Sequence, residues 1–419
     1  MELILALLIL FIAARLAGEA MEQVRQSPMV GEVLAGIVLG PAVLGLVDPN
    51  PMLQPGASLA VVAQLGLLVL VLLAGLELGR EGLHQAFRER SMLVAFVEFF
   101  LPFALGLSLG TALGMSFAQS LFLGTALAIT ALPVSVRILM DLNLLHTRIG
   151  RAIISVALVN DLVAFAMLGL VLEFARLGAS AWNPWTIGLV ATKNLVFLGL
   201  VFCVSIVLKL AMRVAGDGKS HMERLLDRLR GQETGFAVSI LLALALGVAA
   251  EMVGIHFAIG VFYGGILVTP KLIGDVQFAK IRSAASVVTF GLFAPIFFAF
   301  VGLNFSLVSL TWPLIVAITA VAFFGKLVGG ILGGFVAGFR GNRLVALGVG
   351  LNARGMMELL LAQVGLAAGI IDGSIYSALI IMTLVTTLST PPLLKRLMRK
   401  FGTQDALPAV PGVHVDPGP

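Results

Sequence analysis

Residues 153–174 read IISVALVNDLVAFAMLGLVLEF, an apolar stretch with an acid, Asp161, near its middle. The stretch is long enough to cross a lipid bilayer as a helix, because a spanning helix needs about 20 residues. Asp161 is therefore expected near the membrane midplane, where a charge costs about 2.5–3.5 kcal/mol or more. Because such a residue is rare in a membrane helix, Asp161 and the preceding Asn160 are the first candidates for a functional site.

The whole chain has the composition of a polytopic membrane protein. Of its 419 residues, 59% are hydrophobic and 12% are charged, whereas soluble domains carry about 25% charged residues. The single Cys203 excludes an internal disulfide. No sequence motif for a resident metal or a phosphate-containing cofactor is present, so we expect no cofactor. The net charge of +5 is explained by basic residues in the predicted cytoplasmic loops and does not predict a nucleic-acid partner.

Thirteen apolar segments can be counted along the chain. The first lacks the leading positive charge of a secretion signal and is interpreted as an uncleaved span. Thirteen crossings with the N-terminus outside and the C-terminus in the cytoplasm place most of the 27 basic residues inside, as the positive-inside rule requires. The segments are 2–18, 30–47, 58–79, 91–113, 120–141, 150–173, 185–210, 234–254, 257–270, 286–304, 312–338, 345–370 and 375–397.

Thirteen segments divide into two six-helix halves joined by one helix, an inverted-repeat arrangement (6+1+6) used by many secondary transporters. The fifth segment of each half is interrupted, by TALP at 130–133 and by NARG at 352–355. Proline removes a backbone donor, and glycine weakens a helix by about 1 kcal/mol. Either interruption alone would be an ordinary kink, but their matched positions predict a midplane binding site. Thr130 and the carbonyl near Leu132 are expected to offer it neutral oxygens.

Lys326 lies near the middle of a predicted span and has no acid three or four residues away. Its partner must therefore come from another helix, unless its ammonium reaches the membrane surface. Because Asn160 offers no carboxylate, we expect Lys326 to interact with Asp161 or to stay solvated.

The remaining ionisable residues within spans allow two interpretations. Arg354 and Glu358 are four residues apart, which suits a local ion pair on one helix, or they belong to the broken-helix site. Glu98 and Arg137 are expected to pair across helices or to offset the charges of the broken helix ends.

Several motifs, in order along the chain, resemble the monovalent cation:proton antiporter-2 superfamily. The motifs are GIVLGP at 36–41, LAGLEL at 73–78, TALPVSVRIL at 130–139, LLHTRIGRA at 144–152, ALVNDLVAF at 157–165, FVGLNF at 300–305 and NARGMMEL at 352–359. Each motif is weak alone, but the ordered set is specific and spans nearly the whole chain.

The resemblance implies an all-α fold with two crossed broken helices and a homodimer whose core domains move like elevators. It assigns 1–79 and 234–304 to a dimerisation scaffold, 91–173 and 312–398 to a core domain, and 185–214 to a linker helix. Residues 401–419, rich in proline and glycine, are expected to be disordered.

The resemblance also implies that Asp161 binds the transported cation and proton, with Asn160 beside it and Lys326 as a supporting charge. Some members have two adjacent acids where this chain has Asn160 and Asp161. With one carboxylate, we expect one H⁺ to exchange for one monovalent cation without net charge movement.

The leading hypothesis is an antiporter, not an enzyme, that exchanges Na⁺ or K⁺ for H⁺ in a bacterial plasma membrane. The alternatives are a sodium-coupled organic-anion carrier of similar fold and a non-transporting membrane sensor. The carrier would not need a lone acid beside a midplane lysine, and the sensor would not need paired helix breaks.

Overall fold

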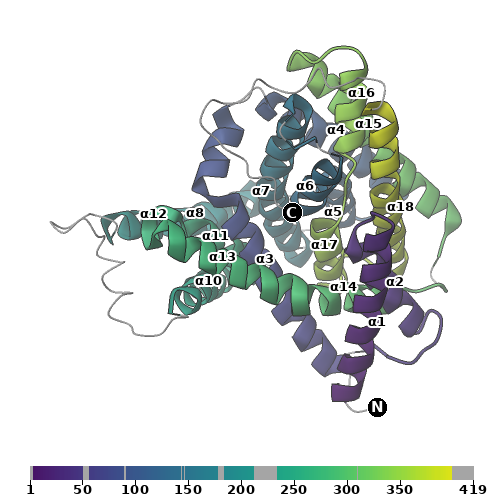
Figure 1. Ribbon diagram of the computed structural model, residues 1–419, viewed down its shortest axis with the longest axis horizontal. Helices are drawn as coiled ribbons and strands as arrows, with labels where there is room; N and C mark the ends of the chain where they lie inside the picture. The colour runs from purple at the N-terminus through teal and green to yellow at the C-terminus, as the bar shows by residue number, and fades with distance from the viewer. Residues whose placement is uncertain are drawn as a thin grey trace.

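The computed structural model describes residues 3–50, 56–88, 91–142, 144–145, 147–177, 184–211, 234–308 and 310–398. All regular elements in these ranges are helices (Figure 1). The predicted tail, 401–419, and the last three residues of the predicted linker helix, 212–214, lie outside the described residues. In chain order the helices are α1 (Leu3–Gln23), α2 (Pro28–Leu39), α3 (Gly56–Arg88), α4 (Ser91–Ala112), α5 (Phe117–Ala128), α6 (Leu132–Asp141), α7 (Arg148–Leu177), α8 (Pro184–Ala211), α10 (Thr234–Val253), α11 (Phe257–Leu267), α12 (Pro270–Ile273), α13 (Asp275–Val288), the π-helical turn η2 (Thr289–Phe293), α14 (Ala294–Leu303), α15 (Trp312–Val336), α16 (Asn342–Gly350), α17 (Met356–Ala367) and α18 (Gly373–Met398).

Within the part of the chain that the structure describes, ten helical stretches are long and apolar enough to cross a membrane, and α2, α11 and α17 are shorter apolar helices. Two helices extend furthest beyond the predicted segments. Helix α3 continues past residue 79 to Arg88, and a helix begins at Asp275 well before the predicted segment 286–304. Both extensions carry charged residues, such as Lys280 and Arg282 in α13. The predicted segments are bounded by charged residues, which end an apolar run, whereas the helices themselves continue through these charged residues.

The helices form two groups by their contacts. In the first, called the α3 group, α1 packs on α2, α2 on α14, α14 and α11 on α3, and α10 and α13 complete the row. In the second, the α15 group, α4 packs on α15, α5 and α7, while α18 packs on α15, α16 and α17, and α6 packs on α7. In Figure 1 the α3 group runs from α1 and α2 on the right to α10–α13 on the left.

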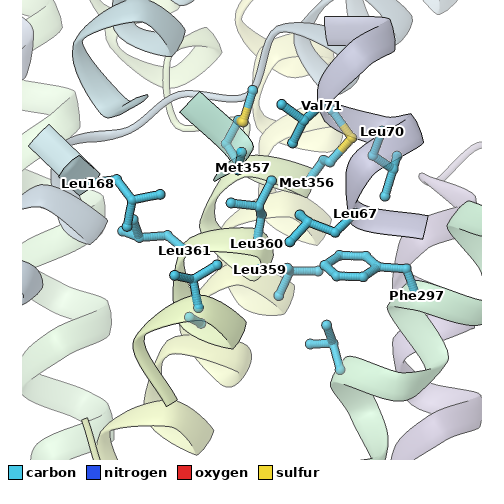
Figure 2. Packing of buried hydrophobic residues seen from close by; sticks show 14 of the residues in the cluster. Leu67, Leu70, Val71, Leu168, Phe297, Met356, Met357, Leu359, Leu360 and Leu361 are labelled. Atoms are coloured by element: carbon cyan, nitrogen blue, oxygen red, sulfur yellow. The ribbon is translucent and has the colours of Figure 1, made fainter. Parts of the chain in front are cut away.

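The two groups meet through apolar side chains. Figure 2 shows Leu67 and Val71 of α3 and Phe297 of α14 facing Met356 and Leu360 of α17. All five are at least 95% buried. No hydrogen bond has to be exchanged between these apolar surfaces. Elsewhere the groups are joined by polar contacts, such as the hydrogen bond from the Tyr376 hydroxyl of α18 to the Val301 carbonyl of α14 at 2.7 Å.

The two predicted interruptions are confirmed. Helix α5 ends at Ala128 and α6 starts at Leu132, with Pro133 in its first turn, where proline's missing N–H is tolerated. Helix α16 ends at Gly350, and α17 starts only at Met356. The unwound segments touch where the Ala131 N–H donates to the Ala353 carbonyl at 3.1 Å.

Close packing of the α3 group depends on glycines. A Cβ added at Gly36 of α2 would collide with the backbone of Ala299 on α14. We therefore expect Gly36→Ala to push the helices apart and lower stability by about 1–3 kcal/mol, as overpacking does. Thermal unfolding in detergent measures this as a lower Tm. Gly199→Ala on α8 is the control, because a Cβ there meets no atom within 4 Å, and its Tm should stay the same or rise slightly. Equal Tm values for the two variants would contradict the packing role of Gly36.

Candidate functional site

Lys326 of α15 is fully buried and forms an ion pair with Glu98 of α4. Its Nζ also donates to Thr130 Oγ1 at 2.5 Å. The prediction that the lysine finds its partner on another helix is confirmed. Lys326 is not solvated, contrary to one of the two expectations; it pairs directly with Glu98, and its charge also acts on Asp161. Gly329, one turn along α15, lies against the Cα of Glu98, and this close approach brings the two charged side chains together.

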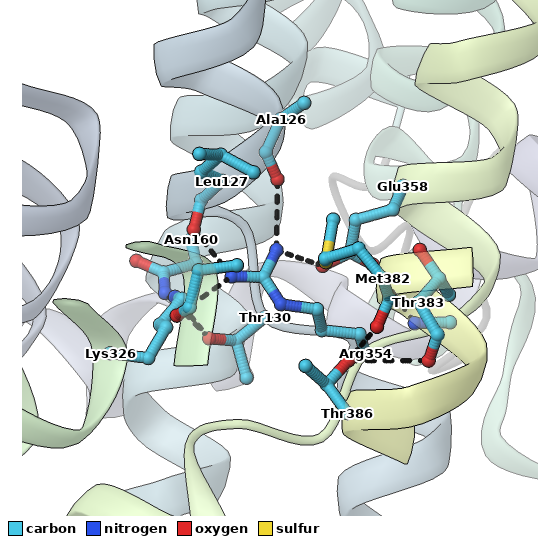
Figure 3. Close-up of polar contacts among 12 residues, drawn as sticks. Ala126, Leu127, Thr130, Asn160, Lys326, Arg354, Glu358, Met382, Thr383 and Thr386 are labelled. Atoms are coloured by element: carbon cyan, nitrogen blue, oxygen red, sulfur yellow. Dashed lines mark hydrogen bonds and ion pairs between the residues drawn. The ribbon is translucent and has the colours of Figure 1, made fainter. Parts of the chain in front are cut away.

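Asn160 and Thr130 complete a buried network around Glu98, and Figure 3 shows both of them beside Lys326. The Asn160 Nδ2 donates to Glu98 Oε2 at 2.8 Å and to Thr130 Oγ1 at 3.2 Å. The Thr130 hydroxyl lies 3.1 Å from Glu98 Oε1 and 3.1 Å from the Leu351 carbonyl, either of which can accept its proton. One hydroxyl thus links both broken helices and the Lys326–Glu98 pair.

Arg354, in the unwound segment before α17, is fully buried and braces the end of α5. It donates to the carbonyls of Ala126 at 2.9 Å and Leu127 at 2.5 Å, and it pairs with Glu358 at 3.1 Å (Figure 3). The last carbonyls of a helix lack intrahelical donors and carry partial negative charge, which the guanidinium offsets. The predicted pairing of Arg354 with Glu358 is confirmed, although Arg354 lies before the start of α17 and the two residues do not share one helix.

Glu358 stabilises the N-terminal end of α17, as Arg354 stabilises the C-terminal end of α5. Its Oε2 accepts the Gly355 N–H at 2.9 Å, and an acid in the first turn stabilises the positive end of a helix. On the other side, Thr387 of α18 donates to the Arg354 carbonyl at 2.8 Å. The break in α16–α17 is thus held by side chains on both sides.

Arg137 lies outside this network. It pairs with Glu22 at the end of α1, and the two side chains are 38% and 43% exposed. The expectation that it pairs with Glu98 or braces a broken helix is wrong. Helix α6 has only ten residues, and Arg137, midway along it, is already more than one third exposed.

Asp161 of α7 is 4% exposed, and its Oδ1 receives no hydrogen bond from any residue that the structure describes. The same holds for the Oδ1 of Asn160. Buried polar atoms in folded proteins almost always have partners. Two consecutive residues whose buried oxygens lack a donor therefore offer acceptors that an electropositive ligand, such as a proton or a cation, could use.

The electrostatic surroundings of Asp161 include one residue that sequence reasoning missed. The charges acting on Asp161 are those of Glu358, Glu77 and Lys326. Glu77 belongs to the α3 group and lies in the LAGLEL motif at 73–78, which is the signal that marks it. Leu132, the other predicted contributor, is the first residue of α6, directly at the break.

No three His, Cys, Asp or Glu side chains within the described ranges come together as a metal site. A cation at Asp161 would meet one carboxylate and otherwise neutral oxygens. This donor set suits a monovalent ion that binds and leaves.

Known proteins share both the sequence and the fold of this chain. Residues 4–400 match the family model for the transmembrane region of sodium/hydrogen exchangers. The chain is 28% identical to the Na(+)/H(+)-K(+) antiporter GerN of Bacillus cereus, over 96% of this chain and 97% of that protein. It is 32% identical to the Na(+)/H(+) antiporter NhaS4 of Synechocystis, over 94% and 97%.

Among solved structures, the fold is similar to that of the sodium proton antiporter MjNhaP1 from Methanocaldococcus jannaschii. The TM-score is 0.70 at 15% identity, and the match covers 96% of this chain and 99% of that one.

The buried Lys326–Glu98 pair should be far more sensitive to substitution than the exposed Arg137–Glu22 pair. Removing one partner of a buried pair strands the other charge and costs about 3–5 kcal/mol, while an exposed pair contributes about 0–1 kcal/mol. We expect Glu98→Gln to lower the Tm in detergent strongly and Arg137→Gln to change it little. Adding Lys326→Gln to Glu98→Gln should restore part of the loss, because no charge is then stranded. A double variant as unstable as the sum of both single variants would argue against a coupled pair.

Proposed function

The chain belongs to the sodium/hydrogen exchanger family and exchanges a monovalent cation for H⁺, and we propose that Asp161 carries both ions in turn. The observation that carries this proposal is the buried Asp161 Oδ1, which has no hydrogen-bond donor among the described residues. A proton and a dehydrated cation each neutralise the same carboxylate, so they compete for it. The cost of leaving a bare charge inside the membrane favours moving the site only when one of them is bound.

The cation, Na⁺ or K⁺, would complete its shell with neutral oxygens. We assign this role to the unpartnered Asn160 Oδ1, to Thr130 and to the backbone carbonyl at Leu132. Irregular backbone at this depth is tolerated where it is buried in protein or lines a cavity. The break between α5 and α6 supplies such backbone.

The remaining charges support the site without binding the ion. Glu98 and Lys326 hold Asn160 and Thr130 in place, and Arg354 and Glu358 stabilise the half-helix ends. Arg137 acts at the periphery, where it links α6 to α1.

We assign the chain thirteen crossings: the ten long stretches and the shorter helices α2, α11 and α17. Matched glycine contacts support the inverted repeat. A Cβ at Gly31 would collide with the backbone of Ala17, and one at Gly260 would collide with that of Leu246. Gly260 follows Gly31 in the sequence by the same number of residues as Leu246 follows Ala17, so the two contacts occupy equivalent positions in the two halves.

A second matched pair of contacts occurs in the α15 group. A Cβ added at Gly106 of α4 would collide with Gly124 of α5, and one added at Gly330 of α15 would collide with Gly348 of α16. Within this pair of contacts, Gly330 follows Gly106 by the same number of residues as Gly348 follows Gly124. This agreement supports pairing α4–α5 with α15–α16 as equivalent parts of two halves.

We assign the α15 group, 91–173 and 312–398, to a mobile core domain, and the α3 group, 1–79 and 234–304, to a scaffold. The apolar contact between the groups (Figure 2) suits a core that slides against a fixed scaffold. We propose a homodimer in a bacterial plasma membrane, with the N-terminus outside and the C-terminus in the cytoplasm, and no enzymatic activity. A sodium-coupled organic-anion carrier is less favoured, because the site presents a carboxylate and buried oxygens, not a cationic pocket for an anion.

Asp161→Asn should abolish exchange while leaving a folded protein. The amide keeps the shape of the side chain but can neither release a proton nor neutralise a cation. Proton movement driven by Na⁺ or K⁺ in proteoliposomes measures the loss, and an unchanged Tm in detergent verifies folding. Arg137→Gln, which changes a charge outside the site, should retain exchange. Cation-dependent proton movement in the Asp161→Asn variant would exclude Asp161 as the shared carrier.

Exchange should be electroneutral, with one H⁺ for one monovalent cation. Asn160 supplies no second carboxylate, and the charge of Lys326 is countered by Glu98 within the core, so only Asp161 changes its charge. Transport by proteoliposomes clamped at different membrane potentials should therefore show the same rate and end-point. A rate or end-point that follows the potential would mean that a second group, with Lys326 the first to test, also releases a proton in each cycle.

A further inference from the structure

Helix α8 stands apart from the rest of the protein. Only 11% of its most apolar window is buried inside the protein, the smallest share among the ten long stretches. It packs mainly on α10 and α12, and in Figure 1 it lies at the end of the molecule opposite to α1 and α2. A groove of about 330 Å³ remains between α8 and the α11–α12 segment. This volume is at the lower end of the range for sites of small ligands, about 300–1,000 Å³.

The groove is apolar at one end and polar at the other. Leu198, Val201 and Tyr263 line one end of the groove. Tyr263 packs beside it against Phe197 of α8, with ring centroids 6.0 Å apart. Further along, Ser205, Lys209 and Thr269 line the groove. Lys209 is about 18 Å beyond Phe197 along the helix axis, at 1.5 Å per residue. The lining thus changes along its length from aromatic and aliphatic side chains to hydroxyls and one cation.

The position of Lys209 fits the level of the lipid headgroups. Helix α8 has 28 residues, with Lys209 in its last turn, whereas the hydrocarbon core of a bilayer needs about 20. Apolar side chains of α8 that do not line the groove are also exposed, with Leu195 68% and Val207 62% exposed, as expected of a surface that faces acyl chains. The groove is therefore expected to open towards the lipid, with Lys209 at the level of the phospholipid headgroups.

We propose that this groove binds one anionic phospholipid, with an acyl chain along the apolar end and the phosphate group at Lys209. An acyl chain matches the aliphatic lining, and the hydroxyls of Ser205 and Thr269 can donate to phosphate oxygens. Basic pockets between membrane helices on the cytoplasmic side are known to attract anionic headgroups. The net negative charge of the lipid is required, because a zwitterionic headgroup would gain little from a single lysine.

The proposal is tested by native mass spectrometry of the full chain in non-ionic detergent, with phosphatidylglycerol and phosphatidylcholine of identical acyl chains as probes. We expect phosphatidylglycerol to bind more tightly than phosphatidylcholine. Lys209→Gln should weaken phosphatidylglycerol binding about five-fold, the effect of losing roughly 1 kcal/mol per lysine, and leave phosphatidylcholine binding unchanged. Ser205→Phe, which fills the groove, should weaken both.

Lys395→Gln is the matched control, because Lys395 is also an exposed lysine in the last turn of a long helix, α18, but does not line the groove. It should bind both lipids like the unmodified chain. The proposal is overturned if the two lipids bind equally well, if Lys395→Gln weakens binding as much as Lys209→Gln, or if Ser205→Phe binds both lipids normally. An unchanged Tm for each variant ensures that the comparison is made on folded protein.

Discussion

The structure depends on how two helices can end in the middle of a membrane. Each break leaves backbone groups without intrahelical partners, and no water is present in the hydrocarbon to satisfy them. Arg354 provides donors for the last carbonyls of α5, and Glu358 accepts an N–H at the start of α17. Because these two side chains also pair with each other, the charges that stabilise the half-helices are themselves balanced. The unwound segments can then cross beside Asp161, whose own oxygen remains available.

Two kinds of packing serve different purposes in the two groups of helices. Within each group, glycines such as Gly36 and Gly330 bring backbones into direct contact, which favours rigid bodies because interiors packed at this density do not deform continuously. Between the groups, the contact in Figure 2 is made by side chains of leucine, valine, methionine and phenylalanine. The protein therefore combines stiffness within its parts with a contact between them that is apolar at α17 and polar where Tyr376 meets Val301 and Arg137 meets Glu22.

Much of the fold followed from the sequence, and the exceptions have physical reasons. TALP and NARG break their helices through local chemistry, so both interruptions could be predicted. The partner of Lys326 could be placed on another helix, but its identity depends on which helices touch, and the contact of Gly329 with Glu98 decides this in three dimensions. Arg137 was misplaced because α6 is short, and a length that depends on the break cannot be read from apolar runs. The role proposed for Asp161 rests on both its rarity in the sequence and its unpartnered oxygen in the structure.

The ion pair between Glu22 and Arg137 joins a helix of the α3 group to one of the α15 group. Any displacement of one group against the other that separates α1 from α6 must break it. Since both side chains are more than one third exposed, dissolved ions screen their attraction, and salt weakens exposed pairs of this kind. The α3 and α15 groups would then separate at this contact more often as the ionic strength rises on the side of the membrane where Glu22 and Arg137 lie. This effect would not depend on which cation is transported. Bulk salt would thus set the pace of the movement through a contact remote from the carboxylate.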